Sequence, residues 1–157
     1  MAKALLKEIV KHCDRTLRIG EIEDYDGAHN GLQVENDGRV SRIAAAVDAT
    51  LATVRMAAEA KADLLVVHHG LFWNAQHPWT GKKRQLIQTL VQNNLAVYSA
   101  HLPLDLHPRL GNNAGLMRAL KFTKPKPFFE ERGSAIGLRT STRLCRDILR
   151  SRLKTIL

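Results

Sequence analysis

Histidines and an aspartate follow two apolar segments of the chain. His68 and His69 end the segment Ala-Asp-Leu-Leu-Val-Val-His-His, and His101 and Asp105 follow the next apolar segment. Imidazole and carboxylate ligands together suit divalent metals such as Zn, Fe, Mn, Co and Ni better than calcium. Two such metals can turn a bridging water into a hydroxide nucleophile near neutral pH. The residue types therefore predict a divalent metal site with metal-assisted hydrolysis as its chemistry.

The adjacent pair His68 and His69 can serve one site only under a condition. Neighbouring residues inside a strand point to opposite faces, so both side chains can reach one site only where the strand ends. Gly70 supplies the irregularity that such an ending needs. The alternative is that these histidines are hydrogen-bonded inside the protein without a metal.

The second segment carries its two candidate ligands four residues apart, as His101 and Asp105. Pro103 stiffens the chain between them, so both side chains could turn toward the same cavity. A histidine ligand also needs an acceptor for its second ring nitrogen, which fixes the tautomer. Asp48, at the end of an earlier strand, is the candidate acceptor by position.

The elements that must position these residues alternate between strand and helix. Apolar spacing predicts helices over residues 2–17, 51–60 (capped by Thr50 or Asp48), 82–93 and 140–157, and a helix that is capped by Asn112 or Asn113 and runs through Leu120. Apolar runs predict strands over residues 42–47, 63–68, 95–100 and 136–138. This alternation is typical of right-handed βαβ units, whose ligands gather at the carboxyl edge of the sheet. The sequence therefore predicts a single α/β domain over residues 1–157, three-layered, with a mostly parallel sheet and flanking helices.

The net charge of +9 is concentrated in the last part of the chain. Residues 1–117 carry 13 Lys or Arg against 12 Asp or Glu, whereas residues 118–157 carry 11 against 3. Such a basic segment is usually a solvated helix face, and binding to a nucleic-acid backbone is the alternative.

The two cysteines and the hydropathy indicate the compartment. Cys13 and Cys145 fit neither a disulfide framework nor a thiolate zinc site, and both are expected to be buried and inert. The sequence contains no apolar stretch long enough to span a bilayer. We therefore expect a cytoplasmic protein with no membrane partner.

Four motifs occur together in one order and spacing: Asn30-Gly31-Leu32-Gln33-Val34, Val47-Asp48-Ala49-Thr50, His68-His69-Gly70-Leu71-Phe72-Trp73, and His101-Leu102-Pro103-Leu104-Asp105 through Gly111-Asn112-Asn113. Over about residues 20–120 the chain resembles the Nif-three-like dinuclear-metal family, known in bacteria as GTP cyclohydrolase I type 2 homologues. The resemblance implies an α/β fold, a toroidal homohexamer and two divalent metals per subunit at an inner cavity.

The resemblance also assigns roles to residues. It implies that His68, His69 and Asp105 are metal ligands, and that His101 lies near the metals as a ligand or as an acid–base group. Members of the family are longer, and their remaining ligands, a His and a Glu, come from a C-terminal segment. Because no histidine follows His107, the resemblance predicts a C-terminally truncated member of the family.

Three functions follow as expectations. The resemblance implies a metal-dependent hydrolase acting on a nucleotide-like substrate, in which His101 moves protons. The sequence has no Gly-rich phosphate loop, so the residues themselves select no nucleotide. The alternatives are a non-catalytic metal-binding oligomeric scaffold or interaction protein, and a nucleic-acid-associated ring that uses the basic C-terminal segment.

Overall fold

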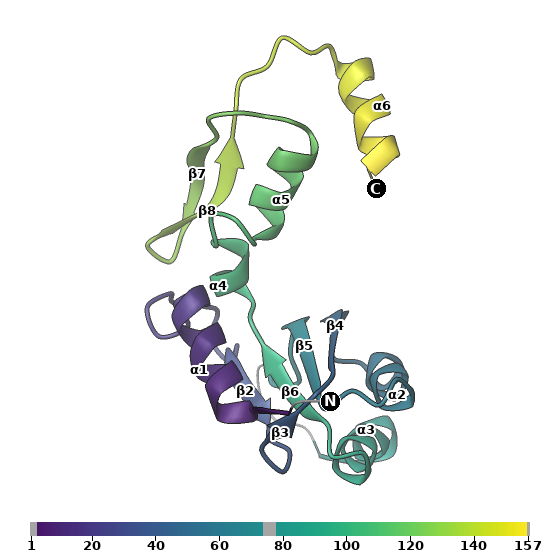
Figure 1. The fold of residues 1–157 in the computed structure, drawn as a ribbon. Coiled ribbons are helices and arrows are strands. Elements are labelled where there is room, and N and C mark those ends of the chain that lie inside the picture. Colours follow the sequence, from purple (N-terminus) through teal and green to yellow (C-terminus); the bar gives the residue numbers. More distant parts are fainter. Residues whose placement is uncertain (1–2, 74–77, 157) are drawn as a thin grey trace. The chain divides into compact units, whose positions relative to one another are not determined.

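The computed structural model describes residues 3–73 and 78–156, which fall into two compact units, Met1–Pro103 and Leu104–Leu157. The one domain expected over residues 1–157 stays a prediction. In chain order, the first unit contains β1 (Ala4–Leu5), α1 (Leu6–Leu17), β2 (Gly31–Val34), β3 (Arg39–Val40), β4 (Ile43–Asp48), α2 (Leu51–Glu59), β5 (Leu64–His69), α3 (Gly81–Gln92) and β6 (Ala96–Ser99) (Figure 1). The elements that follow are α4 (Leu102–Asp105), α5 (Asn112–Ala119), β7 (Lys126–Glu131), β8 (Ser134–Arg139) and α6 (Arg146–Ile156).

The first unit is built on a four-stranded sheet with the strand order β2-β6-β5-β4. β5 pairs in parallel with both β4 and β6, and β2 pairs antiparallel with β6. The parallel pairing brings the carboxyl ends of β4, β5 and β6 to one edge of the sheet. The mixed α/β fold with a mostly parallel sheet is therefore confirmed.

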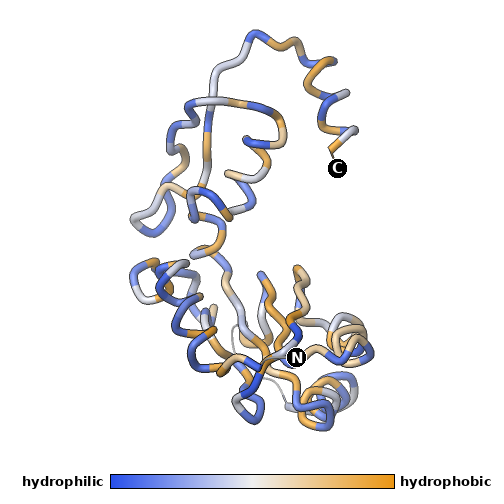
Figure 2. Tube along the Cα trace, viewed as in Figure 1, coloured by the Kyte–Doolittle hydropathy of each residue, from blue (hydrophilic) through white to orange (hydrophobic). Residues whose placement is uncertain are grey.

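Helices cover both faces of this sheet. Val97 belongs to the apolar core that includes Val54 of α2 and Leu90 of α3. The next residue, Tyr98, points to the opposite face because side chains alternate along a strand, and there its hydroxyl donates to Asp14 of α1 at 2.9 Å. The predicted three layers are therefore α2 and α3, the sheet, and α1. Hydrophobic residues are concentrated along β4 and β5, and α1 is largely hydrophilic on its outer side (Figure 2).

The helices and strands of the predicted βαβ units occur at the expected places, within one or two residues of their predicted ends. Thr50 is the N-cap of α2 and forms a capping box with Thr53, which decides between the two predicted caps. The first helix starts at Leu6 rather than residue 2, because residues 4 and 5 pair with β3. The sequence pattern does not predict β2, because this strand has only four residues and begins with Gly31.

The second unit contains an antiparallel hairpin, β7 and β8, beside α5. The side-chain amide of Asn113 donates to the carbonyl of Ile136 at 2.7 Å and so ties α5 to β8. Sequence reasoning predicted only a short strand over residues 136–138 and missed β7. The predicted cap of α5 was wrong, because its N-cap is Gly111.

The last helix and the two cysteines differ from the prediction. The last helix begins at Arg146 rather than at residue 140. Cys145 is exposed and Cys13 is partly buried, so the prediction of two buried thiols was wrong. Within α6, all of which the structure describes, no residue is buried, so its basic side chains face solvent.

Candidate metal centre

Three histidines of the first unit come together at the carboxyl edge of the sheet. The ring centroids of His68 and His69 are 4.5 Å apart, and those of His68 and His101 are 4.8 Å apart. One ligand-capable atom from each ring lies within 4.8 Å of the others. This triad could hold a metal ion.

Hydrogen bonds orient the two rings at the end of β5. His68 Nδ1 lies 3.0 Å from the carbonyl of Ala100, which can only accept, so Nδ1 carries the proton. His69 Nδ1 lies 2.7 Å from Asp48 Oδ1. Asp48 is the cross-strand partner of His69 in the β4–β5 register. The acceptor predicted for this position is therefore present, and it fixes the tautomer that presents Nε2 for ligation.

The third ring has its own carboxylate partner. His101 Nδ1 lies 2.9 Å from Asp24 Oδ1, and only 5% of the Asp24 side chain is exposed. Asp24 also accepts from Asn30 Nδ2 at 2.8 Å and from the backbone N–H groups of Tyr25 and Leu102. Burial would raise the pKa of the Asp24 carboxyl, but these hydrogen bonds together hold its pKa below the ordinary value. The carboxylate is therefore ionised and faces the protonated Nδ1.

Trp73 forms one wall of the centre. Its ring packs edge-on against His101 and His69, with centroids 4.8 and 5.7 Å away. Its indole Nε1 donates to the carbonyl of Gly70 at 3.1 Å, which anchors the ring to the turn that follows β5. The tryptophan therefore places an aromatic ring against two candidate ligands.

Gln33 holds the turn that follows His69. Its Oε1 accepts from the backbone N–H of Leu71, and its Nε2 donates to the carbonyl of His29, both at 2.6 Å. Gly70 allows this close approach, since a Cβ at that position would lie 2.3–2.6 Å from the Gln33 amide. The glycine that sequence reasoning interpreted as a strand ending thus also leaves room for the Gln33 amide.

Asp105 belongs to the second unit, where its carboxylate is also held. Asn112 Nδ2 donates to Asp105 Oδ1 at 2.9 Å. Gly111 packs so closely that a Cβ would lie 2.5–2.7 Å from the backbone oxygens of Asp105, Leu104 and His107. The residues Gly111 and Asn112 therefore set the conformation around Asp105. Its role as a metal ligand stays a prediction, as do the ligand roles of His68 and His69.

Sequence reasoning missed Asp24 and Asn30 as members of the site. Asn30 begins one of the four motifs quoted above, and that motif was the available signal; its Oδ1 accepts from the backbone N–H of His101 at 2.7 Å. Asp24 lies in an irregular acidic segment with no periodic pattern. Nothing local to Asp24 distinguishes it from the neighbouring Glu23 and Asp26.

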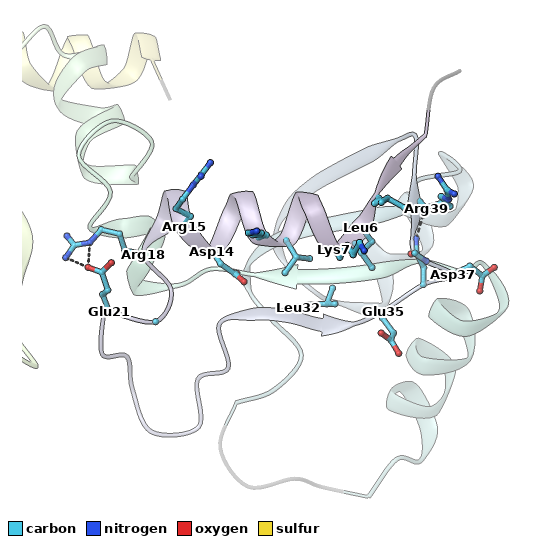
Figure 3. Close-up of a pocket in the computed structure, with 16 residues that line it drawn as sticks. Leu6, Lys7, Asp14, Arg15, Arg18, Glu21, Leu32, Glu35, Asp37 and Arg39 are labelled. Carbon is cyan, nitrogen blue, oxygen red and sulfur yellow. Dashed lines mark hydrogen bonds and ion pairs between the residues drawn. The ribbon is translucent and has the colours of Figure 1, made fainter.

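A large groove of the first unit lies elsewhere. It has a volume of about 870 Å³ between α1 and β2, and none of the three histidines lines it (Figure 3). Its apolar floor includes Leu6 and Leu32, while its rim carries charges of both signs, among them the ion pair of Arg18 and Glu21.

Over the described residues, no helix has the length and hydropathy required to cross a membrane.

Comparison with known proteins agrees with the fold and the motifs. A GTP cyclohydrolase 1 type 2 homolog of Deinococcus radiodurans is 45% identical over 131 residues, which are 83% of this chain and 49% of the relative. The protein of the same name from Halobacterium salinarum is 50% identical over 119 residues, 74% of this chain and 47% of the relative. This chain therefore spans about half the length of the curated relatives it matches.

Solved structures extend the likeness to three dimensions. TTHA1606 from Thermus thermophilus matches with a TM-score of 0.76 and 42% identity, covering 80% of this chain and 51% of that protein. Reduced HcgD from Methanocaldococcus jannaschii matches with a TM-score of 0.73 and 26% identity, covering 83% of this chain and 52% of that protein. The family model for Duf34/NIF3 (NGG1p interacting factor 3) matches residues 4–154. The chain belongs to the Duf34/NIF3 family.

Proposed function

We propose that His68, His69 and His101 bind a divalent metal ion through their Nε2 atoms, and that the bound ion serves a hydrolytic reaction. The observation that carries this proposal is that all three rings turn Nδ1 toward a hydrogen-bond acceptor. Each ring uses Nδ1 in a hydrogen bond to a carbonyl or carboxylate acceptor. The ligand-capable atoms of the three residues lie within 4.8 Å of one another.

The donor set fits a borderline divalent ion. Three imidazoles with second-nitrogen acceptors suit Zn, Fe, Co or Ni better than the hard ions Mg and Ca, which prefer oxygen ligands. Three protein ligands leave room for water or substrate, as catalytic zinc sites require. When bound, such an ion supplies Lewis acidity and a water of lowered pKa.

The chain's own residues would orient the site and limit its access to water. Asp48 and Asp24 hold the protons of His69 and His101 at Nδ1, and Trp73 covers one side of both rings. The ligand role of Asp105 belongs to this proposal through the resemblance alone. The nucleotide-like substrate, the second metal and the homohexamer belong to this proposal through the resemblance alone.

Metal content is the test of the metal site. Protein purified without chelator is expected to carry stoichiometric metal by elemental mass spectrometry, and His69→Ala is expected to lose it. His12→Ala is the matched control, because His12 is an exposed histidine of α1 outside the triad. Metal-free wild-type protein that stays folded and takes up no Zn²⁺, Fe²⁺, Co²⁺ or Ni²⁺ would contradict the proposal.

Hydrolysis is tested separately, with GTP as the probe. We expect metal-dependent turnover that chelation abolishes and that Asp105→Ala reduces while the variant stays folded. Metal binding without turnover would instead favour the non-catalytic metal-binding scaffold.

A further inference from the structure

The three histidines of the triad differ in the group that holds Nδ1. His68 donates to a backbone carbonyl, whereas His69 and His101 each face a carboxylate. The His69–Asp48 pair is open to solvent, with 43% and 54% of the two side chains exposed. The His101–Asp24 pair is enclosed, with 13% and 5% exposed. Water can replace Asp48 as an acceptor more readily than it can replace Asp24.

The Asp24 carboxylate is surrounded by donors. Its Oδ1 receives the backbone N–H of Tyr25 and His101 Nδ1, at 2.7 and 2.9 Å. Its Oδ2 receives Asn30 Nδ2 and the backbone N–H of Leu102, at 2.8 and 3.0 Å. Both oxygens therefore act only as acceptors, and no rotation of the side chain changes this pattern.

A carboxylate at this position dictates the state of the ring. An acceptor at Oδ1 requires the proton of neutral His101 to lie on Nδ1, which leaves the Nε2 lone pair for a metal. An amide in place of Asp24 would set its NH₂ group against two donors in either orientation. With NH₂ at the Oδ1 position, His101 would gain a hydrogen bond by accepting at Nδ1, and its proton would move to Nε2.

We infer that Asp24 is the positioning residue that commits His101 to metal binding, an inference that rests on the proposed metal site. It does so in two ways. It fixes the ring tautomer directly, and together with Asn30 it clamps the backbone of residues 101 and 102. His101 thereby acts as a ligand rather than as a mobile acid–base group.

The inference also links metal binding to a loop. Asp24 and Asn30 belong to the segment between α1 and β2, and His101 follows β6, 77 residues after Asp24. A metal on His101 is expected to favour the arrangement in which this segment is closed onto it. By linkage, loosening the segment should weaken metal binding, and binding the metal should protect the segment.

The experiment compares carboxylate-to-amide variants of the full chain. Zn²⁺ affinity is measured by competition with a chromophoric chelator for the wild type, Asp24→Asn, Asp48→Asn and the exposed control Asp37→Asn. We expect Asp24→Asn to bind Zn²⁺ about 10–100-fold more weakly and Asp48→Asn to lose less than about tenfold. Asp37→Asn should match the wild type, because its side chain lies in the groove region away from the triad.

A spectroscopic readout separates positioning from mere structural support. In the metal-free protein at about pH 8, above the ordinary imidazole pKa of about 6.5, ¹⁵N chemical shifts report the tautomer of each histidine. We expect the Nδ1–H tautomer for His101 in the wild type and a shift toward Nε2–H in Asp24→Asn, with His68 unchanged. Amide exchange over residues 24–30 should slow when Zn²⁺ is added to the wild type.

The outcomes are distinguishable. Wild-type protein that binds no metal at the triad overturns the proposed site and this inference together. Wild-type binding with unchanged affinity in Asp24→Asn overturns the inference alone. If Asp24→Asn does not fold, the wild-type spectrum decides, because an Nε2–H tautomer of His101 in the metal-free wild type contradicts the role given to Asp24. Asn30→Ala then tests the clamp, with an expected loss of Zn²⁺ affinity.

Discussion

Gly70 offers a sharp test of how the turn after β5 is held. The Cβ introduced by Gly70→Ala would lie 2.3 Å from Gln33 Nε2, 2.4 Å from Oε1 and 2.6 Å from Cδ. The Gln33 amide must move away, because the new methyl group is attached directly to the backbone of the turn and cannot rotate aside. That movement breaks the bonds of Gln33 to Leu71 and to His29.

The magnitude follows from these contacts. Two lost hydrogen bonds at about 1 kcal/mol each, with residual overpacking of about 1 kcal/mol, predict a loss of about 2–3 kcal/mol of unfolding free energy. Gly20→Ala is the control, because no heavy atom lies within 4 Å of a Cβ there. It should change stability by less than about 0.5 kcal/mol.

A double-mutant cycle in urea gives the decisive comparison. Gln33→Ala removes the amide, so Gly70→Ala should cost less than about 0.5 kcal/mol in that background. The coupling free energy between the two sites should then be about 2 kcal/mol. If Gly70→Ala costs the same in both backgrounds, the close approach to Gln33 is not the reason for a glycine at this position.

Two further predictions concern stability. Tyr98→Phe should lower the unfolding free energy by about 1–3 kcal/mol in urea, because it leaves Asp14 without the buried hydroxyl, and an unchanged midpoint would contradict that hydrogen bond. Hydrogen bonds from Ser41, partly offset by desolvation, and from Arg42 hold the pKa of Asp63 below its ordinary value. Asp63 therefore contributes stability above its unfolded pKa of about 3.9 that is lost as the pH falls through the folded pKa, so Asp63→Asn should be destabilised at neutral pH and approach the wild type below about pH 4. A difference in unfolding free energy that does not depend on pH would refute this linkage.

Local patterns explain how much of the fold was predictable. The helices at residues 51–59 and 81–92 and the strands at residues 43–48 and 64–69 carry apolar residues at the period of their structure. Thr50 could be recognised as a cap because its hydroxyl needs only residues three positions away. β2 has only four residues and β7 contains Pro127, so neither is long or regular enough to be recognised locally. Each is a strand because it pairs with another segment, β2 with β6 and β7 with β8.

By itself, the sequence determined that three histidines and a carboxylate follow the strands of a parallel sheet, because strand ends and ligand types can be read locally. It also made Asp48 the candidate acceptor, since the carboxyl ends of parallel strands meet at one edge of the sheet. Only the tertiary structure decided that Asp24 holds His101, because that contact joins residues 77 positions apart through an irregular segment. The physical reason is that side-chain acceptors in loops are selected by three-dimensional proximity, for which periodicity carries no signal.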